Sequence, residues 1–248
     1  MILALKTSGL ATTGFCTRWV KAMQARNSLR TLGALVWKDI SAELRTKEMF
    51  SSMFIFVFLA AIIFNFAFEL RVDNVRQVAP GILWVAFSFA GVLGLNRSFV
   101  LEKDQGCLEG LRLAPVDRSL LYLGKALSNL LFMLVVEALG VPLFTALFNL
   151  PLLRLDLALV LLLGTVGVAG VGTLFSAMVV NTRAREVLLP VLLFPIVTPV
   201  LIAAAKLTAG LLDGEALWQM GNWLRLLVAF DVIFLAVSYV IFDYVVEE

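Results

Sequence analysis

Residues 49–68 read MFSSMFIFVFLAAIIFNFAF, a run of 20 residues without a charged side chain. An α-helix needs about 20 apolar residues to cross the hydrocarbon core of a lipid bilayer. The run is too long and too uniformly apolar for a barrel strand, in which lipid-facing and lumen-facing residues alternate. It therefore predicts a membrane-spanning helix.

Five further stretches are also long and predominantly apolar. The six predicted spans are residues 49–68, 78–96, 126–149, 157–182, 187–205 and 226–246. The fifth contains three prolines, so we expect a kinked helix whose freed carbonyls are satisfied by neighbouring groups. The predicted fold class is all-α: a polytopic membrane protein with six transmembrane helices, forming one domain over residues 31–248.

The composition of the whole chain agrees with a lipid environment. Hydrophobic residues make up 61% of the 248 positions and charged residues 15%, whereas soluble domains are roughly 45–50% apolar and about 25% charged. The net charge of +2 does not suggest a nucleic-acid partner. The chain contains no histidine, the commonest metal ligand and general base. We therefore expect no catalytic residues and no metal site.

Lys and Arg residues are distributed unevenly among the connections between these spans. Fifteen of the 20 precede the first span or fall in the second-to-third and fourth-to-fifth connections. Because positively charged loops remain in the cytoplasm, this count predicts that both termini are cytoplasmic. Trp84, Trp218 and Trp223 would then lie near the outer interface, where indole rings concentrate.

The segment before the first span has two parts. Residues 1–30 lack acidic residues, and we expect an unstructured extension there; a wrongly chosen start codon or a mitochondrial transit peptide are the alternatives. Residues 31–48 predict an amphipathic elbow helix on the membrane surface, with basic side chains such as Lys38 toward the head groups. The alternative is a plain cytoplasmic helix. In either case the apolar face of residues 31–48 comprises Leu32, Leu35, Val36, Ile40 and Leu44.

The connection over residues 97–125 is much longer than a helix–helix turn requires. Leu108 and Leu111 stand three residues apart, so they share one face of a short helix, which Pro115 ends. Two exposed leucines on such a helix would suit a socket in a partner protein. A solvated loop that rests on the head groups is the alternative. The candidate residues for a coupling loop are Asp104, Gly106, Leu108, Glu109, Leu111 and Pro115.

Several segments, in this order, resemble the heme exporter protein B family, the permease subunit of the cytochrome c maturation ABC transporter. They are APGILWVA at residues 79–86, GCLEGLRLAP at 106–115, Gly124-Lys125, LLLGT at 161–165 and the proline-rich fifth span. The resemblance runs from about Thr31 to the C-terminus. Where the family commonly has an acid before the loop glycine, this sequence has Gln105, with Asp104 one position earlier.

This resemblance implies a permease of the bacterial inner membrane, or of the mitochondrial inner membrane in some eukaryotes. Its implied partners are a separate ATP-binding ABC subunit, other cytochrome c maturation membrane proteins and a heme chaperone, with two permease copies in a complex. ATP hydrolysis on the partner would drive heme export or the release of the heme-loaded chaperone. The resemblance implies no directly bound cofactor, with heme as the handled substrate.

The residues themselves agree with ATP binding on a partner. Gly124-Lys125 is the only Gly-Lys pair, and Ser119 occupies the position of the first P-loop glycine, so this chain has no P-loop. Without histidine, only methionines such as Met133, Met178 and Met220 could ligate heme iron. Packing is the favoured role for methionines in such spans.

Two acids interrupt the apolar runs of predicted spans: Glu137 in the third, and Asp231 within residues 226–242 of the sixth. A charged residue at the bilayer centre costs roughly 2.5–3.5 kcal/mol, and such residues usually face the interior of the helix bundle. They could form a polar path or a pivot, or simply packing contacts, and Asp231 could pair with Arg225. Four glycines between 164 and 172 predict close helix packing within one subunit, or a dimer interface as the alternative.

Three other functions remain open on these observations. The chain could be the permease of another ABC-2-type exporter that moves lipid, polysaccharide or drug. It could be an ion-coupled carrier that uses Glu137 and Asp231, although the inverted repeats of many carriers are not evident. It could also be a structural scaffold.

Overall fold

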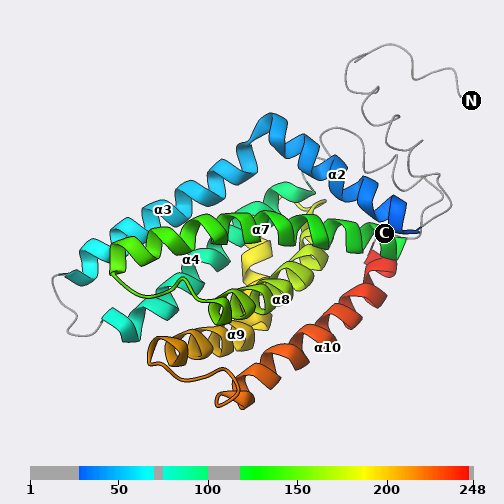
Figure 1. The fold of residues 1–248 in the computed structure, drawn as a ribbon. Coiled ribbons are helices and arrows are strands. Elements are labelled where there is room, and N and C mark those ends of the chain that lie inside the picture. The colour runs from blue at the N-terminus through cyan, green and yellow to red at the C-terminus, as the bar shows by residue number, and fades with distance from the viewer. Residues whose placement is uncertain (1–27, 70–74, 100–117, 246–248) are drawn as a thin grey trace, which may run out of the picture.

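The computed structural model describes residues 28–69, 75–99 and 118–245, and the elements in these ranges are α-helices (Figure 1). The helices are α2 (Ser28–Thr46), α3 (Glu48–Glu69), α4 (Val75–Ser98), α7 (Arg118–Phe148), α8 (Leu155–Val179), α9 (Arg185–Leu212) and α10 (Gly221–Val245). The all-α prediction is confirmed.

Six of these helices, α3, α4, α7, α8, α9 and α10, are long and apolar enough to cross a membrane. They correspond one to one to the six predicted spans. α7 begins well before the predicted start at residue 126, because Lys125, which ended the apolar run in the sequence, lies inside the helix and is paired with an acid. α9 continues as one helix through Pro190, Pro195 and Pro199.

The helices form an inner and an outer set. α4 and α8 are the inner helices, since 72% of the span window of each is buried, against 22% for α3 and for α10. α8 contacts four neighbours: α4, α7, α9 and α10. α3 and α10 lie on opposite flanks of the bundle (Figure 1). The residues of the inner helices therefore contact protein on most sides.

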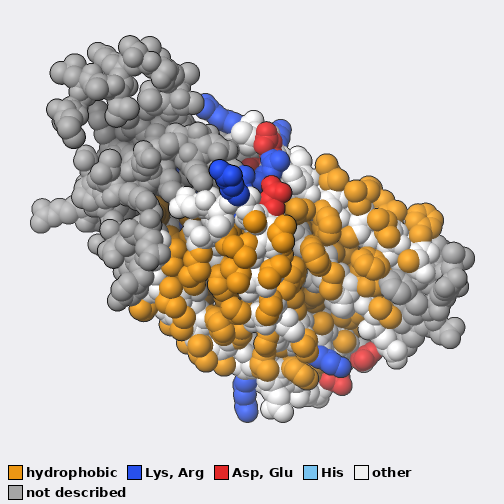
Figure 2. All heavy atoms as spheres, turned by 180° about the vertical axis from the view of Figure 1, so that it is seen from behind, with side chains coloured by type: hydrophobic (Ala, Val, Ile, Leu, Met, Phe, Trp, Pro, Cys, Tyr) orange, Lys and Arg blue, Asp and Glu red, His pale blue; other side chains and the backbone are white. Residues whose placement is uncertain are grey.

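The surface of the bundle separates into an apolar band and two charged ends. Figure 2 shows hydrophobic side chains across the middle of the molecule, with Lys, Arg, Asp and Glu at its two ends. Exposed apolar residues on the outer helices, such as Ile63 and Phe66 on α3 and Val232 and Ile233 on α10, contribute to the apolar surface. This distribution is that of a multi-pass membrane protein, whose apolar side chains face lipid.

The amphipathic helix α2 packs against α7 and α3, at the end of the bundle where α10 also ends (Figure 1). Leu35 is buried there, whereas Trp37 and Leu44 are exposed. Lys38, expected to face the head groups, is also buried, and its ammonium lies 3.4 Å from the carboxylate of Asp39. Part of the polar face of α2 thus packs into the protein.

Candidate functional site

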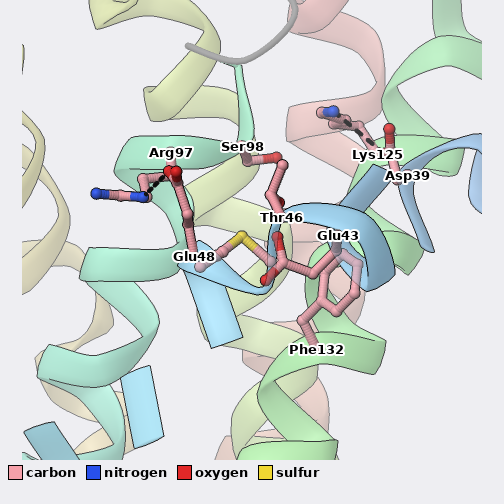
Figure 3. A pocket seen from close by; sticks show the side chains of 9 residues that line it. Asp39, Glu43, Thr46, Glu48, Arg97, Ser98, Lys125 and Phe132 are labelled. Atoms are coloured by element: carbon pink, nitrogen blue, oxygen red, sulfur yellow. Dashed lines mark hydrogen bonds and ion pairs between the residues drawn. The ribbon is translucent and has the colours of Figure 1, made fainter. Parts of the chain in front are cut away.

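A pocket lies at one end of the bundle, where α2, α3, α4 and α7 meet (Figure 3). Charged side chains from all four helices line it, together with a few neutral ones. The lining residues are Asp39, Glu43, Thr46, Glu48, Met49, Arg97, Ser98, Lys125 and Phe132. Basic and acidic groups face one another here, so the pocket contains ion pairs between helices that are far apart in sequence.

One of these pairs is largely buried. The ammonium of Lys125 on α7 lies 3.1 Å from Oδ2 of Asp39 on α2, and the two side chains are only 5% and 12% exposed. The same ammonium lies 5.4 Å from the centre of the Phe99 ring, within the range of a cation–π contact. Removing one partner of such a pair leaves a poorly solvated charge, which is strongly destabilising. This pair therefore holds α2 against the start of α7.

The Gly124-Lys125 dipeptide acts as a two-part docking site for α2. A Cβ atom on Gly124 would lie 3.0 Å from the Leu35 side chain, so the glycine allows α2 to approach closely. The next residue, Lys125, binds Asp39. Because Leu35 and Asp39 are four residues apart, they lie on one face of α2 and contact both residues of the dipeptide.

The bend between α2 and α3 is also fixed by side chains. Lys47 has a φ of 55°, a left-handed conformation that ends α2. Oε1 of Glu43 accepts a hydrogen bond of 2.8 Å from the backbone N–H of Phe50, one of the free donors in the first turn of α3. A carboxylate at a helix N-terminus is also favoured by the helix dipole. The two helices are therefore coupled through a defined elbow.

A second ion pair joins this elbow to α4. Nη1 of Arg97 lies 2.6 Å from Oε2 of Glu48, and both side chains are at least half exposed. Exposed pairs contribute only about 0–1 kcal/mol, so this contact positions the helix ends more than it stabilises them. The last turn of α4 therefore contacts the start of α3, and the first turns of α7 contact the middle of α2. These two helix ends flank residues 100–117.

The six candidate residues of the coupling loop fall within residues 100–117, outside the described part of the chain. They are Asp104, Gly106, Leu108, Glu109, Leu111 and Pro115. Their role stays a prediction.

Glu137 is buried between α7 and α8. Its Oε1 accepts a hydrogen bond of 2.6 Å from the hydroxyl of Thr165. Its Oε2 has no hydrogen-bond partner among the described residues. A small cavity beside it, about 10 Å³ in volume, is lined by residues of α4, α7 and α8, including Trp84 and Ser88. The expectation that this acid faces the bundle interior is confirmed.

Asp231 is buried as well, on the opposite side of α8. A Cβ atom on Gly167 would lie 2.6 Å from its Oδ1, so the absence of a side chain at 167 makes room for the carboxyl group. Within the described ranges neither carboxyl oxygen of Asp231 has a hydrogen-bond partner. The predicted pairing with Arg225 is therefore wrong: that side chain is exposed near the start of α10.

Trp84, predicted near the outer interface, is buried inside the bundle. It is only 2% exposed, and its indole N–H donates a hydrogen bond of 3.1 Å to the hydroxyl of Thr208 on α9. The ring lies against Gly164 of α8, which has no side chain to obstruct it. A buried indole with its donor satisfied is stable inside the bundle. Trp218 and Trp223, by contrast, are exposed near the junction of α9 and α10.

The four glycines of α8 face side chains of this same chain. Trp84 covers Gly164, Asp231 covers Gly167, and Leu235 and Leu95 cover Gly170 and Gly172, so every glycine of the cluster has a neighbour within the subunit. Small residues allow such close helix contacts in membranes. Packing within one subunit, rather than a dimer interface, is therefore their role.

Comparison with known proteins identifies the family. The family model described as CcmB protein matches residues 30–247, which is nearly the entire chain. The chain belongs to the CcmB family. The resemblance to heme exporter protein B seen in the sequence is thereby confirmed.

Individual CcmB relatives cover most of the same region. Heme exporter protein B of Rhodobacter capsulatus is 30% identical over 185 residues, which is 74% of this chain and 85% of the relative. The proteins of the same name from Paracoccus denitrificans and Pseudomonas aeruginosa are 30% and 31% identical, covering 70% and 64% of this chain and 80% and 72% of theirs.

Sequence reasoning missed three features of this CcmB family member: the Lys125–Asp39 pair, the Trp84–Thr208 hydrogen bond and the contact between Thr165 and Glu137. The partners in the first two are 86 and 124 residues apart, so no local pattern joins them. No local pattern pairs Gly124-Lys125 with the segment that forms α2. The signal available in the sequence was Lys125 itself, because a lysine in a helix that continues into the membrane requires an acidic partner.

Proposed function

We propose that this chain is the permease subunit of an ABC transporter that acts on heme in the biogenesis of c-type cytochromes. The observation that carries the proposal is the family match over residues 30–247, together with relatives named heme exporter protein B. ATP binding and hydrolysis occur on a separate subunit, since the sequence has no P-loop. The work of that subunit drives heme export or the release of a heme-loaded chaperone.

In this proposal, residues 100–117 receive the movement of the ATP-binding subunit in the cytoplasm of a bacterial cell, and two permease copies act together. The geometry of the flanking segments supports such a role. Arg97 before this stretch contacts Glu48, and Lys125 after it contacts Asp39. A displacement of the stretch would therefore act on α4, on α7 and on the α2–α3 elbow at once.

The biological role is tested by deleting the gene and measuring covalently bound heme in c-type cytochromes. We expect holocytochrome to be lost and to return with the wild-type gene. Normal holocytochrome in the deletion strain would reject the maturation role and favour an exporter of lipid, polysaccharide or drug.

The coupling role is tested by changing Leu108 and Leu111 together to Asp and purifying the complex. We expect the ATP-binding subunit to be lost, because charged side chains cannot occupy an apolar socket. The matched control is the pair Leu153→Asp and Leu155→Asp. Those leucines are 69% and 91% exposed, and they lie at the opposite end of the bundle, where Leu153 precedes α8 and Leu155 is its first residue.

The control variant should retain the ATP-binding subunit at the wild-type level. Full retention in the Leu108→Asp, Leu111→Asp variant would show that this loop is not the docking site. Loss in both variants would indicate a general folding defect and would also remove the support for a specific socket.

A further inference from the structure

The carboxyl group of Glu137 has a buried oxygen, Oε2, to which no described residue donates a hydrogen bond. The side chain is only 5% exposed, and Oε2 has no partner among the described residues, whereas Oε1 is bound by Thr165. A buried polar atom without a partner is costly in protein interiors, and more so where no bulk water is near. A ligand at this position would remove that cost.

The cavity next to Glu137 has the size and the lining for one water molecule. Its volume is about 10 Å³, close to the minimum that a single water requires. Its lining residues carry four side-chain oxygens, two on Glu137 and one each on Ser88 and Thr165. Internal waters typically form 2–4 hydrogen bonds with such groups.

The hydroxyl groups in the lining have spare acceptor capacity. Ser88 donates its hydrogen to the backbone oxygen of Trp84 at 2.5 Å, and Thr165 donates its hydrogen to Glu137. Each hydroxyl oxygen still has lone pairs for a water hydrogen. The site suits both forms of Glu137, since a carboxylate oxygen accepts from the water and a carboxylic acid donates to it.

We propose that this cavity holds one water molecule between Glu137 and Ser88, so that a hydrated polar junction joins α4, α7 and α8 within the membrane. α4 and α7 are also the two helices that flank residues 100–117. If the proposed coupling role holds, the two helices re-angle about this junction. A bound water can exchange hydrogen bonds during that movement, whereas two directly bonded side chains would have to separate.

The water itself is tested on the full wild-type chain in lipid nanodiscs, bound to an antibody fragment, by electron cryo-microscopy at a resolution that shows ordered water. We expect one density within hydrogen-bond distance of Oε2 of Glu137 and of Oγ of Ser88. An empty cavity, or a direct hydrogen bond between the two side chains, would overturn the proposal.

Three variants test what holds the water. Glu137→Gln keeps polar atoms at the site and should retain the density, whereas Glu137→Leu should lose it. Thr208→Val is the matched control, since it removes the hydrogen bond to Trp84 but takes no oxygen from the cavity; it should keep the density. Density that persists in Glu137→Leu would contradict the assignment.

Denaturant titration and holocytochrome measurements extend the test to energetics and function. Glu137→Leu removes the hydrogen bond with Thr165 that joins α7 to α8. The unfolded population should therefore rise about threefold, the equivalent of the ~0.6 kcal/mol average for polar interactions between membrane helices.

Holocytochrome should fall in Glu137→Leu and be retained in Glu137→Gln, with the ATP-binding subunit still bound in both variants. Full activity of Glu137→Leu would refute the pivot role. Failure of the wild-type chain to bind that subunit would refute the proposed function but not the water site.

Discussion

Replacing Gly164 with alanine should destabilise the bundle, because the added methyl group would overlap the indole of Trp84. The new Cβ atom would lie 2.7 Å from Cζ3 of that ring and closer still to Cη2. The ring cannot move away freely, because it is buried and its N–H is bonded to Thr208. The substitution therefore forces α4 and α8 apart or breaks this hydrogen bond.

The expected magnitude follows from three contributions. Overpacking a buried site costs about 1–3 kcal/mol, and loss of the indole hydrogen bond adds about 1 kcal/mol. The higher helix propensity of alanine offsets about 1 kcal/mol. The net loss is about 2 kcal/mol, which corresponds to a fall of roughly 4–8 °C in the Tm for a chain of this size.

Thermal unfolding of the purified protein in detergent, followed by circular dichroism, measures this change. Gly81→Ala is the matched control: Gly81 lies on α4 like Trp84, but a Cβ atom there would meet nothing within 4 Å. Its Tm should stay constant or rise. Combining Gly164→Ala with Trp84→Phe removes the overlapping atoms, so the two effects should be less than additive. Equal Tm values for Gly164→Ala and Gly81→Ala would refute the packing argument.

Three further predictions concern charged residues. Lys125→Met should lower the free energy of unfolding by about 1.5–3 kcal/mol in chemical denaturation, because the largely buried Asp39 keeps Lys38 but loses its hydrogen bond with a second charged group. A loss under 1 kcal/mol would contradict this, and in the double variant with Asp39→Asn the two losses should be less than additive. Glu48→Gln should change the same free energy by about 1 kcal/mol or less, since its pair with Arg97 is exposed; a loss as large as that of Lys125→Met would show that exposure does not weaken this pair. Asp231→Leu should raise the Tm, because Asp231 is a buried carboxyl group without a partner in the described ranges. Its replacement removes about 1–3 kcal/mol of desolvation cost. A lower Tm would contradict this reasoning.

Much of the fold was predictable because a lipid environment imposes a simple requirement on sequence. Each span must be an apolar stretch long enough to cross the membrane as a helix that bonds its own backbone groups. The burial of Glu137 and Asp231 followed from the same reasoning, since a carboxyl group is costly in contact with lipid. The existence of helix α2 followed from the apolar periodicity of residues 31–48, although its buried Lys38 did not.

The candidate site was less predictable. In a soluble helix the apolar stripe shows which face is buried, but the spans here are apolar on every side. The hydropathy of the second span therefore did not distinguish Trp84, which is buried, from the adjacent Val85, which is 46% exposed. The sequence also did not identify the partner of Lys125, because Asp39 lies on a helix that approaches α7 only in the folded bundle.

The sequence alone determined that this chain crosses a membrane six times, where each crossing lies, and that two acids turn away from lipid, because hydrophobic length and charge cost depend on local composition. Only the tertiary structure decided which helices lie inside, that Trp84 and Asp231 pack against glycines of α8, and that the Lys125–Asp39 pair holds α2 against α7. Those features depend on the close approach of helices distant in sequence, and side-chain shape, rather than hydropathy, selects that arrangement.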